Sequence, residues 1–234
     1  MKMKTLSVSD PRIDLGSIAT IARPVSLSSD QYRVLFAKID LHCRPDGKKI
    51  IAVTSTVKRE GKTTTIANLT VVCARDFGKR CLLIDGDVRH PNIATIFQIA
   101  EAPGLVDVVE KRCLLENAMK RGPVEHLTLL TLGGSGEQGG RLWASDVIRN
   151  LLGEARGWFD YIFIDSPPIL SHADINLITE FSDGVLLVVR AGLAEEALLD
   201  QAVKSLGRSK IIGSVLNGEK DEWPVRSYHQ YGYY

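Results

Sequence analysis

Six short apolar runs are spaced along the chain, and each has the length of a β-strand. The runs are apolar on both faces, which is typical of parallel strands that are covered by other elements on both sides. They occupy residues 50–53, 81–84, 127–130, 161–164, 184–189 and 211–216. We therefore expect a mainly parallel sheet buried in the middle of the domain.

Between these runs, apolar residues recur at spacings of three and four, which predicts helices. The clearest such segments are residues 63–76, 142–155 and 194–207. Another amphipathic helix is expected before the first strand, where a cap at Ser28 to Asp30 precedes Tyr32, Leu35, Phe36, Ile39 and Cys43. The alternation predicts an α/β fold with helices on both faces of the sheet and ligands at the carboxyl ends of its strands.

The chain of 234 residues divides into three zones. Residues 1–27 mix Ser, Pro, Thr and Gly without a period, and we interpret them as a flexible leader with an arm that can pack on the core. Residues 28–217 form the expected folded domain, and residues 218–234 form a flexible tyrosine-rich tail.

Composition narrows the possible partners. The 29 basic and 28 acidic side chains leave a formal net charge of +1, so no overall field draws the protein to nucleic acid. The four cysteines lie far apart and form no CxxC pair, and the five histidines have no zinc spacing. No apolar run approaches the roughly 20 residues of a membrane span, so a cytoplasmic protein is expected.

A polar turn containing Gly61, Lys62 and Thr63 links the first strand to the first long helix. Backbone N–H groups at such a helix start bind phosphate, Lys62 can reach the terminal phosphates, and Thr63 can ligate Mg²⁺ through its hydroxyl. The expected nucleotide contacts here are Lys58, Arg59, Glu60, Gly61, Lys62, Thr63 and Thr64. Since the generic motif has glycine where this chain has Thr56, an ordinary basic helix cap stays open as an alternative.

Acidic residues follow two further predicted strands, at the same end of the predicted sheet. Asp85 and Asp87 follow the second run, and Asp165 follows the run at 161–164. Carboxylate oxygens are hard ligands that Mg²⁺ prefers, and the metal keeps several waters. The three acids together with Lys62 favour a nucleotide site that uses ATP and Mg²⁺.

At these motifs the chain resembles the bacterial tyrosine kinases, which are P-loop enzymes paired with capsule and exopolysaccharide export. Residues 54–63 resemble the Walker A motif of that family, residues 82–89 its second motif, Walker A′, and residues 163–168 its Walker B motif. The resemblance extends over residues 28–217 and implies a P-loop NTPase-type fold.

The resemblance also implies roles for single residues. Asp85 and Asp87 would share metal and general-base duties, and Asp165 would act on the water shell of the metal. Arg190 and Asn217 lie in two further stretches similar to the family and join the expected nucleotide contacts. The expected catalytic residues are Lys62, Asp85, Asp87 and Asp165, and the expected metal ligands are Thr63, Asp85 and Asp165.

The tail carries the expected phosphate acceptors. Four of the six tyrosines lie in the last seven residues, at Tyr228, Tyr231, Tyr233 and Tyr234. The 17 residues that follow Asn217 span at most about 60 Å when extended, which is enough to reach a neighbouring copy. An aromatic terminus that packs on a neighbour is the alternative.

The resulting expectation is an ATP-dependent tyrosine autokinase that regulates the polymerisation and export of exopolysaccharide or capsule. The family implies a separate membrane-embedded activator of the polysaccharide chain-length regulator type, a tyrosine phosphatase and a homo-oligomer. It also implies a position at the inner face of the cell membrane through that activator, with no nucleic acid partner.

Departures from the family pattern keep other readings open. Lys58 and Arg59 stand where many members have Pro-Gly, and Phe36 replaces an arginine of the helix that forms rings in the family, where Asp30 and Arg33 remain. A partitioning-type P-loop ATPase is the second hypothesis, although its signature lysine would fall at Val57. An ATP-binding scaffold without kinase activity is the third.

Overall fold

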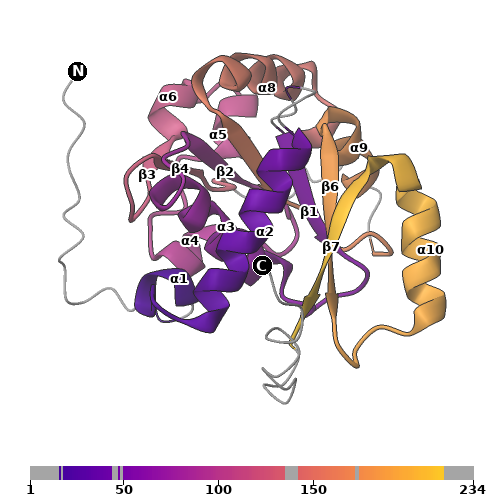
Figure 1. Ribbon diagram of the computed structural model, residues 1–234. Helices are drawn as coiled ribbons and strands as arrows, with labels where there is room; N and C mark the ends of the chain where they lie inside the picture. The colour runs from indigo at the N-terminus through magenta and orange to yellow at the C-terminus, as the bar shows by residue number, and fades with distance from the viewer. Residues whose placement is uncertain are drawn as a thin grey trace.

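A seven-stranded sheet forms the centre of the computed structural model, which describes residues 16, 18–43, 47, 50–134, 142–171 and 174–218 (Figure 1). Its strands are β1 (Ile50–Ser55), β2 (Cys81–Asp85), β3 (Lys120–Arg121), β4 (Leu127–Leu130), β5 (Tyr161–Asp165), β6 (Gly184–Arg190) and β7 (Ile211–Asn217). Their order across the sheet is β3-β4-β2-β5-β1-β6-β7, and every pair is parallel except β3 with β4.

Helices cover both faces of this sheet (Figure 1). One face packs against α1 (Ala19–Ala22), α2 (Leu27–Cys43), α3 (Lys62–Arg75) and α4 (Ile93–Phe97). The other packs against α5 (Leu105–Val109), α6 (Leu115–Ala118), α8 (Asp146–Trp158), α9 (Asp174–Phe181) and α10 (Glu196–Leu206). A 3₁₀ turn, η1 (Arg208–Lys210), precedes β7.

The apolar runs form the central strands because both faces of the sheet are buried. All residues of β1, β2 and β5 are buried, and successive residues of β1 alternate between the two cores, with Ile50 and Ala52 in one and Ile51 and Val53 in the other. The predicted α/β fold with a mainly parallel sheet covered on both faces is therefore confirmed.

Two features of the sheet differ from the prediction. β7 is only partly buried, with Leu216 58% exposed, because it lies at the edge of the sheet. β3 was not expected, since two residues, Lys120 and Arg121, are too short to produce a hydrophobic pattern.

The helices also show one displacement. The helix expected over residues 142–155 begins at Asp146, where the Ser145 hydroxyl caps it by accepting from Val147 N at 3.1 Å. Leu142 and Trp143 belong to a separate turn before that cap. The apolar spacing therefore predicted one helix where the structure has a short turn followed by a helix.

The end of the expected leader packs on the folded domain. Ile18 and Thr20 are fully buried, and Thr20 N donates to the side-chain oxygen of Asn68 on α3 at 2.9 Å. Residues 1–15 and 17 of the leader lie outside the described residues, as do residues 219–234 of the tail.

Candidate active site

The turn between β1 and α3 leaves the first N–H groups of α3 available for an anion. Gly61 is the N-cap of α3 with φ +89°, and it offers no side-chain acceptor to the helix start. A Cβ at this position would lie 2.1 Å from Asn217 Nδ2, so only glycine fits. The first turn of a helix lacks internal acceptors for its N–H groups, and its dipole favours negative charge there.

Lys62 connects this turn to the acids of two strands. Its ammonium donates to Asp87 Oδ2 at 2.9 Å and lies 3.5 Å from Asp165 Oδ1. Thr63 Oγ1 donates to Asp165 Oδ2 at 2.7 Å. The structure thus brings together Lys62, Thr63, Asp87 and Asp165, four residues that the sequence singled out.

Asp85 completes the group from the neighbouring strand. It is paired in register with Asp165 across β2 and β5, so both carboxyl groups leave the sheet at the same level. Asp85 Oδ2 accepts from the N–H groups of Asn92 and Ile93, each at 2.9 Å. Asp85 Oδ1 is buried and has no hydrogen-bond partner among the described residues.

Burial and mutual repulsion change how these acids ionise. Burial, and next the charge of Asp165, raise the pKa of Asp85 to about 8. Burial also raises the pKa of Asp165, although Lys62 opposes this. Burial alone would lower the pKa of Lys62, but Asp165 and Asp87 outweigh it and raise that pKa.

These donors fit a magnesium ion. The unpartnered Asp85 Oδ1 and the crowded carboxylates are what a divalent cation or its waters would satisfy, since Mg²⁺ takes oxygen ligands and retains water. In the described part of the chain, no three His, Cys, Asp or Glu side chains form a complete metal cage. A cation here would therefore also need Thr63, water and a phosphate.

Comparisons with known proteins identify the family. A family model described as an AAA domain matches residues 48–206. The chain is 34% identical to tyrosine-protein kinase YwqD of Bacillus subtilis (strain 168) over 220 residues, which cover 93% of this chain and 91% of YwqD. The chain belongs to the bacterial tyrosine kinase family. The expected P-loop NTPase-type fold and family are thus confirmed, and this fold binds nucleotides.

Two further likenesses were found, one to a curated protein and one to a solved structure. It is 30% identical to the succinoglycan biosynthesis transport protein ExoP of Rhizobium meliloti (strain 1021), over 83% of this chain but only 25% of ExoP. It superimposes on the solved structure of the chimerical protein CapA2B2 with a TM-score of 0.81 and 26% identity, covering 86% of this chain and 89% of that one.

The Glu60 side chain stabilises the P-loop of this kinase through hydrogen bonds within the protein. It is fully buried, and its two carboxylate oxygens accept from Val57 N at 2.8 Å and Arg190 N at 3.2 Å. Asn217 Nδ2 donates to Glu60 O at 2.8 Å. Because the Glu60 carboxylate is already hydrogen-bonded within the protein, the predicted nucleotide contact of Glu60 applies to its backbone only, and it stays a prediction.

The other expected nucleotide contacts surround the same turn. Lys58, Arg59, Thr64 and Arg190 are exposed. Lys58 Nζ lies 3.5 Å from His90 Nε2, which connects the P-loop to the Walker A′ turn. Arg190 Nη1 donates to Arg59 O at 3.4 Å.

Trp143 was not predicted to influence the site, yet it holds the Walker A′ turn. It is fully buried and donates from Nε1 to Gly86 O at 3.3 Å, while Gly86 N donates to Asp165 O at 2.7 Å. A Cβ on Gly86 would lie 2.7 Å from Asp165 O. A lone tryptophan after a Gly-rich stretch carries no signal that distinguishes this role from ordinary packing.

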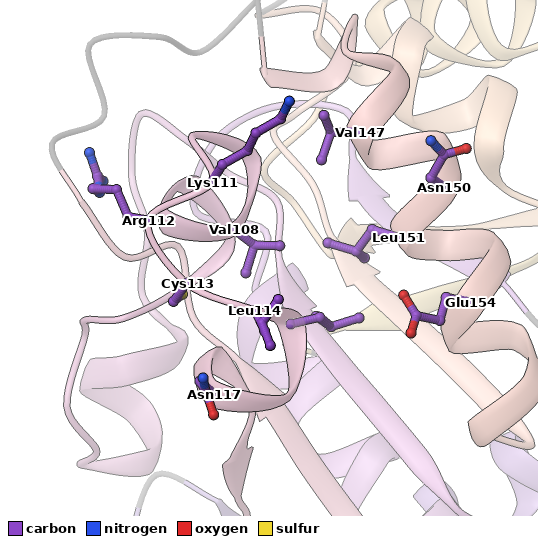
Figure 2. Close-up of a pocket in the computed structure, with 11 residues that line it drawn as sticks. Val108, Lys111, Arg112, Cys113, Leu114, Asn117, Val147, Asn150, Leu151 and Glu154 are labelled. Atoms are coloured by element: carbon purple, nitrogen blue, oxygen red, sulfur yellow. The ribbon is translucent and has the colours of Figure 1, made fainter.

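A separate cavity of about 700 Å³ lies between α5, α6 and α8 (Figure 2). Val108 and Leu151 face one another across it, and Lys111, Asn150 and Glu154 stand around its edge (Figure 2). None of its lining residues belongs to the phosphate site, so the chemistry described above does not involve it.

Proposed function

We propose that this protein is an ATP-dependent protein-tyrosine autokinase. The observation that carries the proposal is the convergence of Lys62 and Thr63 with Asp87 and Asp165, carboxylates that follow two adjacent strands of the sheet. The acceptors would be Tyr228, Tyr231, Tyr233 and Tyr234, which lie outside the described residues.

Phosphoryl transfer depends mainly on positioning and on neutralising the charge that develops on the γ-phosphate. In this proposal, Lys62 exchanges its contacts with Asp87 and Asp165 for phosphate oxygens. The N–H groups at the start of α3 hold the neighbouring phosphate, and the Glu60 carboxylate keeps the turn in shape. The ligand would be ATP, in keeping with the nucleotide-binding fold.

The two acids of the Walker A′ turn differ in position, which supports a division of roles. Asp87 contacts Lys62 and accepts from His90 N at 3.1 Å, so it lies beside the P-loop lysine. It would accept the proton of the tyrosine hydroxyl. Asp85, fixed by two N–H groups beside Asp165, would face the metal.

Thr63, Asp85 and Asp165 would hold the magnesium ion, directly or through water. When bound, Mg²⁺ supplies positive charge to the β- and γ-phosphates. The residues that hold it are set by the edge of the sheet, so their relative positions need little rearrangement.

The decisive test removes the ammonium group of the P-loop. Lys62→Met deletes a charge-assisted contact of roughly 1.5–3 kcal/mol, about ten- to over a hundredfold in nucleotide affinity, and the loss in rate should be larger. Purified protein incubated with Mg-ATP should show no phosphotyrosine by mass spectrometry. Lys204→Met on α10 serves as the control and should label normally, whereas undiminished labelling of Lys62→Met would exclude this site.

The biological setting follows from the relatives as a proposal. ExoP is named a succinoglycan biosynthesis transport protein, and this chain matches a quarter of it. Among the described residues, no helix combines the length and the apolar character that a membrane crossing requires. We infer a cytoplasmic kinase that acts in exopolysaccharide or capsule export and is held at the membrane by an embedded activator of the chain-length regulator type.

A tyrosine phosphatase that resets the tail and a homo-oligomer complete this proposal. Adding the cytoplasmic end of the activator should raise autophosphorylation, and an unchanged rate would argue against it. A partitioning ATPase is not favoured, because the family is that of the kinases and Val57 stands where such proteins carry a lysine. A scaffold without kinase activity would bind nucleotide and leave every tyrosine unlabelled.

A further inference from the structure

Three exposed cations border the turn before α3. Lys58, Arg59 and Arg190, which we call the basic rim, come from the turn before α3 and from the end of β6. Arg190 Nη1 lies 3.4 Å from Arg59 O, and Lys58 Nζ lies 3.5 Å from His90 Nε2. Within the described ranges, none of the three pairs with a carboxylate.

The backbone at Arg59 has a conformation that an arginine rarely adopts. Arg59 has φ +68°, a left-handed conformation that glycine adopts freely and that costs other residues roughly 1 kcal/mol or more. The chain thus has an arginine where a glycine would be free of this strain, and the arginine adds a charge to the rim.

The last described residues of the chain pass directly beside the basic rim. Ala191 N donates to Asn217 O at 2.9 Å, and Asn217 Nδ2 donates to the P-loop at Glu60 O. A Cβ on Gly218 would lie 3.1 Å from Cγ and Nε of Arg190. The root of the tail is therefore attached to the P-loop and to one of the three cations.

The residues that follow Gly218 are mostly acidic. They read Glu219-Lys220-Asp221-Glu222, and three carboxylates thus stand before the first tail tyrosine, Tyr228. Glu222 is four residues beyond Gly218, so it cannot move more than about 14 Å from it. A short tether of this kind gives an effective concentration in the millimolar range.

We propose that this acidic run, residues 219–222, binds the basic rim of its own chain. The inference rests on the proposed function, because the same three cations are expected to meet the phosphates of ATP. The acidic run and the nucleotide then compete for the rim.

A crosslinking experiment tests the contact without any nucleotide. A carbodiimide joins the Lys58 ammonium to a carboxylate that lies in contact with it, and peptide mapping locates the bond. We expect Lys58 joined to Asp221 or Glu222 within one chain. A mixture of isotopically light and heavy protein distinguishes the sources, because pairs of mixed isotope would show that the acids come from a second copy and would overturn the intramolecular contact.

Competition supplies the second test, with a non-hydrolysable ATP analogue as the probe. Neutralising the run, as Glu219→Gln, Asp221→Asn and Glu222→Gln together, should tighten binding of the analogue about three- to tenfold at low salt, and by less in 0.5 M salt because exposed charges are screened. In a protein with Lys58→Ala and Arg59→Gly, where Arg190 alone remains of the rim, the same three changes should have a smaller effect. An equal gain in both backgrounds would overturn the proposal.

A matched control separates local binding from net charge. Glu116→Gln on α6, Glu125→Gln before β4 and Glu154→Gln on α8 remove the same number of exposed acids, and should leave analogue affinity unchanged. Failure of the inference and failure of the proposed function differ clearly. If neutralising the acidic run leaves analogue affinity unchanged, the inference is refuted. If the protein binds no analogue at all, the proposed function is refuted, and the crosslinking experiment alone then tests the contact between the run and the rim.

Discussion

The buried carboxyl group of Asp85 lowers the stability of the folded protein. One of its oxygens is held by two N–H groups and the other has no partner in the described part of the chain. Its pKa rises from the ordinary 3.8 to about 8, chiefly because the carboxyl group is buried and then because Asp165 is near. Between these two values the folded state binds a proton that the unfolded state has lost, so the free energy of unfolding falls as pH rises.

Asp85→Asn should therefore stabilise the metal-free protein. With EDTA present at pH 8, we expect the Tm to rise by about 2–8 °C, since removing a poorly satisfied buried group is worth roughly 1–2 kcal/mol. The gain should shrink as the pH falls toward 3.8, because below that value Asp85 is protonated in both the folded and the unfolded state. Tyrosine phosphorylation should fall in the same variant, and a lower Tm at pH 8 would contradict this account.

The residues of the site were largely predictable because their chemistry is local. Lys62, Thr63, Asp85, Asp87 and Asp165 each stand at a strand end or a helix start, and the carboxyl ends of parallel strands meet at one edge. The engagement of the Glu60 carboxylate was not predictable, because its partner Arg190 N is 130 residues away. The hydrogen bond from Trp143 likewise depends on a contact across 57 residues.

At the scale of an element, α2 shows how packing overrides a sequence motif. Phe36 stands where the family's ring-forming helix has an arginine, yet its side chain is fully buried. Its ring lies 4.7 Å from that of Phe77 and 5.2 Å from that of Tyr161, in edge contacts. Arg33 instead donates to Asp30 and Asp76 at the surface.

Phe36→Ala should thus be a core mutation. We expect it to lower the free energy of unfolding by about 3–5 kcal/mol through lost burial and an unfilled cavity. Val34→Ala on the same helix, where the side chain is 54% exposed, should change it by less than about 0.5 kcal/mol. Chemical denaturation measures both, and a small effect of Phe36→Ala would mean that this helix is held chiefly by other contacts.

The elements missed from the sequence share a physical reason. α4, α5 and α6 have five, five and four residues, too few to repeat a helical period, and their apolar residues pack into the two cores, α4 on one face of the sheet and α5 and α6 on the other. The longer α2, α3 and α10 show several turns of apolar spacing and begin close to where the pattern predicts. Tertiary packing determines the short helices, and local pattern determines the long ones.

At the scale of the whole molecule, phosphorylation would reverse the sign of the charge. Each phosphotyrosine adds about −1.5 to −2 charges, so four would change the net charge from +1 to roughly −5 to −7. We expect unmodified tails to enter the sites of neighbouring copies and modified tails to leave them, because repulsion then opposes assembly.

Replacing Tyr228, Tyr231, Tyr233 and Tyr234 by Glu should lower the oligomeric mass measured by light scattering. The same four positions changed to Phe should keep the mass of the unmodified protein while removing every label. An equal mass for the Glu variant and the wild type would show that tail charge does not control assembly.

The pairing of Asp85 with Asp165 constrains how such an enzyme can be regulated. Both acids stand on one rung of the most deeply buried part of the sheet, so no hinge exists between them. A regulator that changes the rate must therefore act on the turns that face this rung, and the spacing of the two acids should be the same in the resting and the stimulated enzyme.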